Sequence, residues 1–203
     1  MPSPSDNPDL HGNVPDQSRV ALLLTDVLNP MDFPGAEAFV PRALQTGERI
    51  ARLARRARES HVPVVYINDN FTGRWRSDLS QLLATGTQMN TPGRPLLTMH
   101  APQRTDYVVL KPKHSGFFAT PLESLLVYLG ARHLVLAGFT TDQCVLFTAS
   151  DAFLRDYRLH VPADCTDTVE PQDKAPALHL MEKRLHVDTR SSEAIDWAAL
   201  ARS

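Results

Sequence analysis

The sequence predicts a three-layer α/β/α domain, Rossmann-like in outline, built on a mostly parallel sheet of six strands. Short apolar runs alternate along the chain with longer segments of helical periodicity, as in consecutive βαβ units. The first run, VALLLT at Val20–Thr25, is typical of a strand buried on both faces of a parallel sheet. A chain of 203 residues, 42% of them hydrophobic, is long enough to bury one substantial core.

Each element follows from a local pattern of this kind. The expected strands are the apolar runs Val20–Thr25, Pro63–Ile67, Tyr107–Leu110, His133–Ala137, Arg158–Val161 and Leu185–Val187. The expected helices have apolar residues three and four apart, and they are Ala36–Ser60, a short one around Leu79–Thr85, Pro121–Leu129, about Asp142–Arg155, Gln172–Lys183 and Glu193–Ala201. Parallel strands joined by helices place their carboxyl ends along one edge, where such sheets bind ligands.

The helix that begins at Pro121 has the clearest predicted ends. Thr120 is the expected N-cap, and Glu123 follows it at the spacing of a capping box. Proline suits the first helical position, and Gly130 is the expected residue just beyond the last turn.

Residues 1–18 form an expected mobile arm, and residues 19–203 form the expected globular α/β domain. The arm contains Pro2, Pro4, Pro8 and Pro15 and hardly any apolar residues, so it buries too little surface to offset the entropy of ordering. A partner-binding tail is the alternative interpretation.

Composition excludes several classes of protein. The formal charge of -2 gives no basic field for nucleic acid, and no apolar run reaches the ~18 residues of a membrane span. The amino terminus lacks the pattern of a secretory signal, and two cysteines make no disulfide framework. We therefore expect a cytoplasmic protein without a nucleic-acid or membrane partner.

Three residues with chemical potential lie at or just beyond the carboxyl ends of predicted strands: Asp26, Lys111 and Cys144. Cys144 lies in the first turn of a predicted helix, where unpaired amides and the helix dipole favour a thiolate. A nearby lysine would lower the pKa of the thiol further, and a carboxylate would accept and return its proton. Taken singly, a buried structural cysteine, a turn aspartate and a surface lysine explain these residues equally well.

Two motifs give the chain a resemblance to a known family. The first is Lys111 followed by Ser115, Gly116 and Phe117, and the second is the GFTTDQCV turn from Gly138 to Val145. Together with the opening LLLTDVLNPMDFPG and the segment VYINDNFTGRW, they resemble the isochorismatase-like cysteine hydrolases. That superfamily includes nicotinamidases, N-carbamoylsarcosine amidohydrolases and ureidoacrylate or maleamate amidohydrolases, and the resemblance extends from about residue 19 to 193.

The resemblance implies a catalytic triad of Asp26, Lys111 and Cys144. It also implies a cis peptide bond between Phe139 and Thr140, which aims the amides of Thr140 and Cys144 into an oxyanion hole. Residues expected to contact the substrate are Phe33, Arg74, Trp75, His114 and Phe139. For His114 a packed or surface role is the alternative, and for Trp75 a place in the core.

The resemblance also shows where this chain departs from its relatives. Nicotinamidases bind a metal through an Asp-x-His pair, whereas this chain has Asn68, Asp69 and Asn70 in that region. The eight histidines show no ligand spacing either, so we expect no metal and no cofactor.

The expected activity is therefore metal-independent hydrolysis of a C–N bond in a small amide or carbamoyl compound, through a thioester on Cys144. One alternative is an isochorismatase-type vinyl-ether hydrolase in which Asp26 acts as the acid. Another is a catalytically silent binding or scaffold member of the family. Relatives are commonly oligomeric, so a homodimer or homotetramer is expected.

Overall fold

The computed structural model describes residues 16–69, 80, 83 and 91–203. The expected arm up to residue 15, most of the expected helix around Leu79–Thr85, and Arg74 and Trp75 lie outside them. Asp16 and Ser18, the described end of the arm, contact the domain. Tyr107 Oη donates to Asp16 Oδ2 at 2.5 Å, and the Ser18 amide donates to the Leu129 carbonyl at 2.8 Å.

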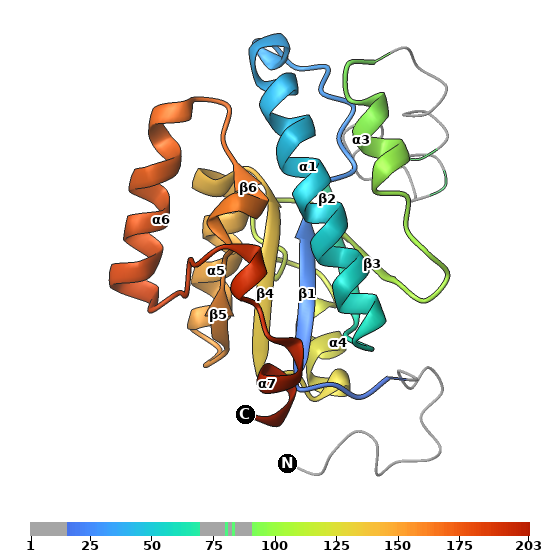
Figure 1. Cartoon of the computed structure of the whole chain (residues 1–203), viewed down its shortest axis with the longest axis vertical. Helices are drawn as coiled ribbons and strands as arrows, with labels where there is room; N and C mark the ends of the chain where they lie inside the picture. Colours follow the sequence, from blue (N-terminus) through green and yellow to red (C-terminus); the bar gives the residue numbers. More distant parts are fainter. Residues whose placement is uncertain (1–15, 70–79, 81–82, 84–90) are drawn as a thin grey trace.

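A parallel sheet forms the centre of the molecule (Figure 1). Its strands are β1 (Val20–Thr25), β2 (Val64–Asp69), β3 (Tyr107–Lys111), β4 (His133–Phe139), β5 (Arg158–His160) and β6 (Thr166–Asp167). Their order is β3-β2-β1-β4-β5, with β6 also paired to β4, and every pair is parallel. All residues of β1 and β4 are buried, as the apolar runs predicted for strands covered on both faces.

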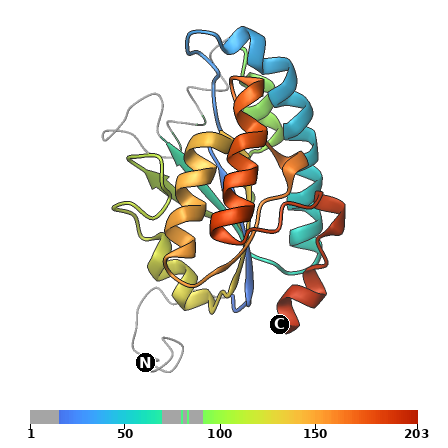
Figure 2. The same ribbon diagram turned by 90° about the vertical axis from the view of Figure 1, so that its left-hand side faces the viewer.

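Helices cover both faces of the sheet, which confirms the three-layer fold class (Figure 2). The helices are α1 (Ala36–Glu59), α3 (Arg94–Met99), α4 (Leu122–Leu129), α5 (Leu146–Phe153), α6 (Pro171–Leu185) and α7 (Trp197–Arg202). Side chains of α1, α3 and α7 pack into one core cluster, and those of α4, α5 and α6 pack into the other. Alternate side chains of β1 enter the two clusters, Leu22 and Leu24 on one side and Leu23 on the other.

The sixth strand is not the one that the sequence predicted. Leu185 is the last residue of α6, and His186 adopts a left-handed conformation with φ 53° that ends the helix. After it the chain makes only an isolated bridge between Asp188 and His160. The sixth strand is instead β6, whose Thr166 pairs with Gly138 at the carboxyl end of β4. Two residues are too few to show an alternation of apolar and polar positions, so this strand leaves no pattern in the sequence.

The ends of α4 confirm one expectation and correct another. Gly130 adopts the left-handed conformation at φ 75° and ends the helix, as predicted. At the other end the N-cap is Pro121 and not Thr120, because the helix begins one residue later than predicted. Thr120 Oγ1 accepts a hydrogen bond from the Leu122 amide at 3.2 Å, but no capping box forms. Glu123 instead forms an ion pair with Arg155 of the segment after α5, at 2.9 Å.

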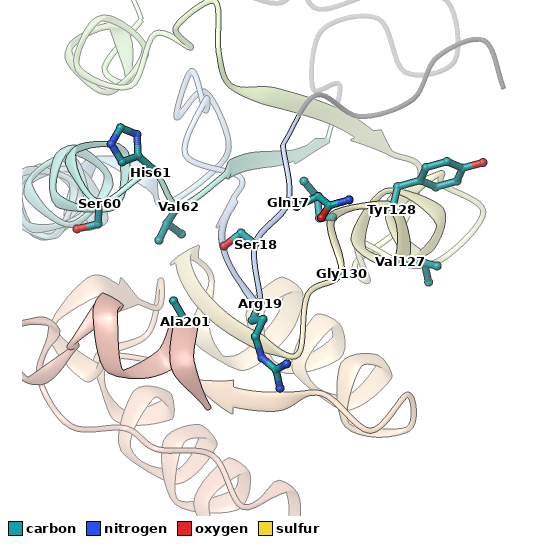
Figure 3. Close-up of a pocket in the computed structure, with 11 residues that line it drawn as sticks. Gln17, Ser18, Arg19, Ser60, His61, Val62, Val127, Tyr128, Gly130 and Ala201 are labelled. Carbon is teal, nitrogen blue, oxygen red and sulfur yellow. The ribbon is translucent and has the colours of Figure 1, made fainter. Parts of the chain in front are cut away.

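A pocket of about 460 Å³ lies at the amino ends of the strands, opposite the edge expected to carry the chemistry (Figure 3). Arg19 before β1, Ser60 after α1, Gly130 after α4 and Ala201 of α7 are among its lining residues. The pocket includes none of the residues predicted for the site. None of the described helices is both long and apolar enough to cross a membrane.

Candidate active site

The structure brings together the three side chains that the strand ends predicted. Asp26 directly follows β1, Lys111 is the last residue of β3, and Cys144 follows β4 in the next turn of chain. Lys111 Nζ lies 2.8 Å from Asp26 Oδ2 and 3.4 Å from Cys144 Sγ. Exposure is 3% for Asp26 and Lys111 and 9% for Cys144, so the cluster is almost closed to solvent. Strand β2 lies between β3, which carries Lys111, and β1, which precedes Asp26. The long lysine side chain therefore reaches across β2 to bring its ammonium to the carboxylate.

Backbone contacts hold Asp26 in position. Its own amide donates to the Ile67 carbonyl at 2.9 Å, and its Oδ1 accepts from the Asp69 amide at 2.7 Å. The residue has a positive φ of 51°, an uncommon conformation in which the chain turns out of β1. Asn68 fixes the loop that follows Asp26. Its side-chain amide accepts a hydrogen bond from the Leu28 amide and donates one to the Leu28 carbonyl, each at 3.0 Å. Both carboxylate oxygens of Asp26 therefore have partners, one the ammonium and one a backbone amide.

Cys144 lies in a π-helical turn, Thr141–Val145, and not in the first turn of an α-helix as the sequence predicted. The α-helix α5 begins only at Leu146. Thr148, one turn further on, donates to the Cys144 carbonyl at 2.6 Å and so ties the turn to α5. Wider turns of this kind are frequent at functional sites, and residue spacing alone does not distinguish them from α-helix.

The peptide bond between Phe139 and Thr140 is cis, as the resemblance implied. It joins the end of β4 to the turn that carries Cys144. The Thr140 carbonyl accepts from the Gln143 and Val145 amides at 3.2 and 3.1 Å and closes this turn.

Electrostatics at the thiol differ from the expectation. Burial raises the pKa of Cys144 to about 12, and the negative charge of Asp26 adds to that effect, while Lys111 lowers the pKa by less. Burial by itself lowers the pKa of Lys111, but Asp26 and Cys144 together raise it above its ordinary value. Both shifts favour the protonated form, the ammonium of Lys111 and the thiol of Cys144. The low thiol pKa was expected from the lysine and the helix end alone. The loss of water around the sulfur, which raises the pKa, was not part of that expectation.

Phe139 lies in the core and not at a surface open to substrate. Its side chain is 1% exposed, and its ring packs edge to face on Phe39 of α1, with centroids 5.7 Å apart. Side chains alternate along a strand, and this position of β4 faces α1. Phe33 is partly buried and packs against the same core cluster.

His114 is exposed and lies beside the thiol, with Nδ1 3.7 Å from Cys144 Sγ. Its ring stacks on Phe147 of α5, with centroids 5.6 Å apart and planes 30° from parallel. Phe147 was not among the residues expected to contact the substrate. Its position three residues after Cys144 was the available signal, because residues three apart on a helix share a face.

No group of three or more His, Cys, Asp or Glu side chains is placed to hold a metal ion among the residues that the structure describes. Cys165, the second cysteine, is fully buried in the core cluster beside α1. Burial raises the pKa of its thiol to about 12 as well.

Comparison with known proteins gives one family. The family model described as the Isochorismatase domain matches residues 20–193. The isochorismatase family protein YaaI of Bacillus subtilis is 35% identical over 175 residues, which are 86% of this chain and 95% of that protein. The ureidoacrylate amidohydrolase RutB of Methylobacterium radiotolerans is 30% identical over a match that covers 77% of this chain and 70% of RutB.

Solved structures agree with this result. The N-carbamoylsarcosine amidase of Thermoplasma acidophilum superposes with a TM-score of 0.69 and 26% identity, covering 88% of this chain and 99% of that one. The nicotinamidase of Staphylococcus aureus superposes with a TM-score of 0.63 and 22% identity, covering 85% of this chain and 97% of the nicotinamidase chain. At that level of identity the second likeness concerns the fold alone.

Proposed function

This chain belongs to the isochorismatase family of hydrolases, and we propose that it is a metal-independent cysteine hydrolase that cleaves a C–N bond of a small amide or carbamoyl compound. The observation that carries the proposal is the contact of Lys111 Nζ with both Asp26 and Cys144 Sγ in a nearly closed site. The similarity to an N-carbamoylsarcosine amidase and to a ureidoacrylate amidohydrolase supports the class of substrate.

The reaction begins with a proton transfer, because burial raises the pKa of the Cys144 thiol and favours its protonated form. Asp26 takes the proton from Cys144 as the sulfur attacks the carbonyl carbon. Lys111 stabilises the negative charge that develops on the sulfur during this transfer. Attack converts the carbonyl oxygen into an oxyanion, which the amides of Thr140 and Cys144 bind.

Collapse of this intermediate breaks the C–N bond. Asp26 returns its proton to the nitrogen, which leaves as ammonia or an amine, and the acyl group stays on Cys144 as a thioester. Water then hydrolyses the thioester, releases the acid and restores the thiol. Vinyl-ether hydrolysis needs the acid alone, so a lysine in contact with a thiol favours the C–N reaction.

A substrate panel tests this proposal. Purified protein is incubated with small primary amides, N-carbamoyl amino acids and isochorismate, and ammonia and pyruvate are measured separately. We expect ammonia from at least one amide or carbamoyl compound and no pyruvate, with the same rate after dialysis against EDTA. Release of pyruvate alone would establish the vinyl-ether activity, and loss of the rate in EDTA would contradict metal independence.

A further inference from the structure

We propose that His114 is a further catalytic residue, the base that activates the water molecule which cleaves the thioester. This inference rests on the proposed function, since it concerns the second half of that reaction. His114 Nδ1 lies 3.7 Å from Cys144 Sγ, within contact distance of the atom that carries the acyl group.

The groups around the thiol differ in exposure. Asp26 and Lys111 are each 3% exposed, and they are paired with one another at 2.8 Å. His114 is exposed to solvent. The imidazole is therefore more accessible to water than the carboxylate. The second oxygen of Asp26 is also engaged, by the Asp69 amide at 2.7 Å.

Contacts on both sides of His114 hold its ring at the sulfur. The preceding carbonyl, of Lys113, accepts a hydrogen bond from Lys111 Nζ at 3.2 Å. The following hydroxyl, of Ser115, donates to the Asp151 carboxylate on α5. The ring itself stacks on Phe147, on the same helix. The loop that carries the imidazole is therefore fixed to both the lysine and the helix that follows the nucleophile.

The proposed step balances without any co-reactant beyond water. A water molecule gives a proton to the imidazole nitrogen as its oxygen bonds to the thioester carbon. The C–S bond breaks and its electron pair returns to sulfur, which takes the proton back from the imidazolium. The products are the carboxylic or carbamic acid, the thiol of Cys144 and neutral imidazole.

An activated ester separates the two halves of the reaction without knowledge of the natural substrate. p-Nitrophenyl acetate acylates a reactive thiol in a burst of nitrophenolate, and the later steady rate reports hydrolysis of the acetyl thioester. We compare the unmodified protein with His114→Gln, which keeps a polar side chain but removes the base. His179→Gln, at an exposed histidine of α6, is the matched control, and Cys144→Ala marks the background.

His114→Gln is expected to keep the burst and to lower the steady rate about 100-fold, the typical contribution of a general base. The acetyl group should then accumulate on Cys144, as seen in the intact mass, while His179→Gln behaves like the unmodified protein. An unchanged steady rate in His114→Gln, or equal loss of burst and steady rate, contradicts the role of His114 and leaves the proposed function standing. A burst that is absent from the unmodified protein, or that persists in Cys144→Ala, contradicts the nucleophile and the proposed function as well.

Discussion

Two charged side chains of opposite sign lie near the Cys144 sulfur, and burial decides the state of the thiol. Asp26 and loss of water raise the pKa of Cys144, and Lys111 lowers it by less. The aspartate and lysine are paired at 2.8 Å, and their charges act on the sulfur in opposite directions. A thiol of this kind needs a base at the moment of attack, and the carboxylate that raises its pKa is also the group able to receive its proton.

Replacement of Asp26 by asparagine separates these two effects. The negative charge disappears and the Lys111 ammonium remains, so the pKa of Cys144 should fall and its alkylation by iodoacetamide at pH 7 should become at least about tenfold faster. Hydrolysis should fall about 100-fold or more, because the base is lost. Alkylation is followed by peptide mass spectrometry, with buried Cys165 as the internal reference. Slower alkylation together with lost hydrolysis would mean that Asp26 only supports the local structure.

At the scale of residues, position was predictable from the sequence and environment was not. Asp26, Lys111 and Cys144 follow or end apolar runs, and parallel strand order was enough to place them on one edge. The thiol pKa depends on how much water surrounds the sulfur, which no local pattern records. Phe139 is a similar case, because its contact with Phe39 joins residues 100 positions apart in the chain.

Gly138 of β4 lies directly against the backbone of β1. Its φ is 121°, and a Cβ there would lie 2.0 Å from the Thr25 carbonyl oxygen of β1. Gly138→Ala should therefore destabilise the fold by about 3 kcal/mol or more, since backbone cannot move aside as a side chain does. Gly130→Ala is the control, with a positive φ of 75° but nothing within 4 Å of the added Cβ. There we expect only the cost of the left-handed conformation, about 1 kcal/mol. Urea unfolding measures the free energy of unfolding of both variants. An equal decrease in the two would show that the contact with β1 is unimportant.

At the scale of elements, the sequence predicts those with many residues and misses those with few. Helix α1 matches its prediction to within one residue, because a long stretch of apolar spacing defines it. The two-residue strand β6 and the five-residue π-helical turn at Cys144 carry no period of their own. Both depend on the pairing of distant segments, Thr166 with Gly138 and the Thr166 hydroxyl with that of Thr141 at 2.8 Å.

The stability of the whole molecule should fall in mild acid because of His100. This side chain is 2% exposed, and burial, with a smaller effect of Arg58, lowers its pKa to about 4. Between the ordinary value of 6.5 and about 4, the unfolded chain binds a proton that the folded chain does not. The free energy of unfolding therefore decreases as the pH falls through this range, by up to about 3 kcal/mol.

The variant His100→Leu isolates this contribution. Nε2 of His100 has no hydrogen-bond partner among the described residues, so leucine removes the proton site without breaking a described bond at that atom. Urea unfolding at pH 4, 5, 6 and 7 should give a flatter pH dependence for His100→Leu than for the unmodified protein. His179→Gln should keep the original slope. The same dependence of unfolding free energy on pH in all three proteins would show that a group other than His100 causes the acid sensitivity.

At the scale of the whole chain, fold class and family were accessible from the sequence because both rest on features spread over many residues. Oligomeric state stays a prediction. Several large apolar side chains of the described residues are exposed, among them Phe118, Phe147 and Leu154. The number of copies that associate depends on a second molecule and not on the order of residues in one.

In the proposed reaction the Cys144 sulfur forms the bond to substrate. This role is tested by the rate of ammonia release by Cys144→Ala, on the best amide or carbamoyl substrate of the panel, beside Cys165→Ala as the matched control. We expect a loss of about 1000-fold or more in Cys144→Ala, with an unchanged thermal unfolding transition, and near-normal turnover in Cys165→Ala. Hydrolysis by folded Cys144→Ala at the unmodified rate would contradict this role.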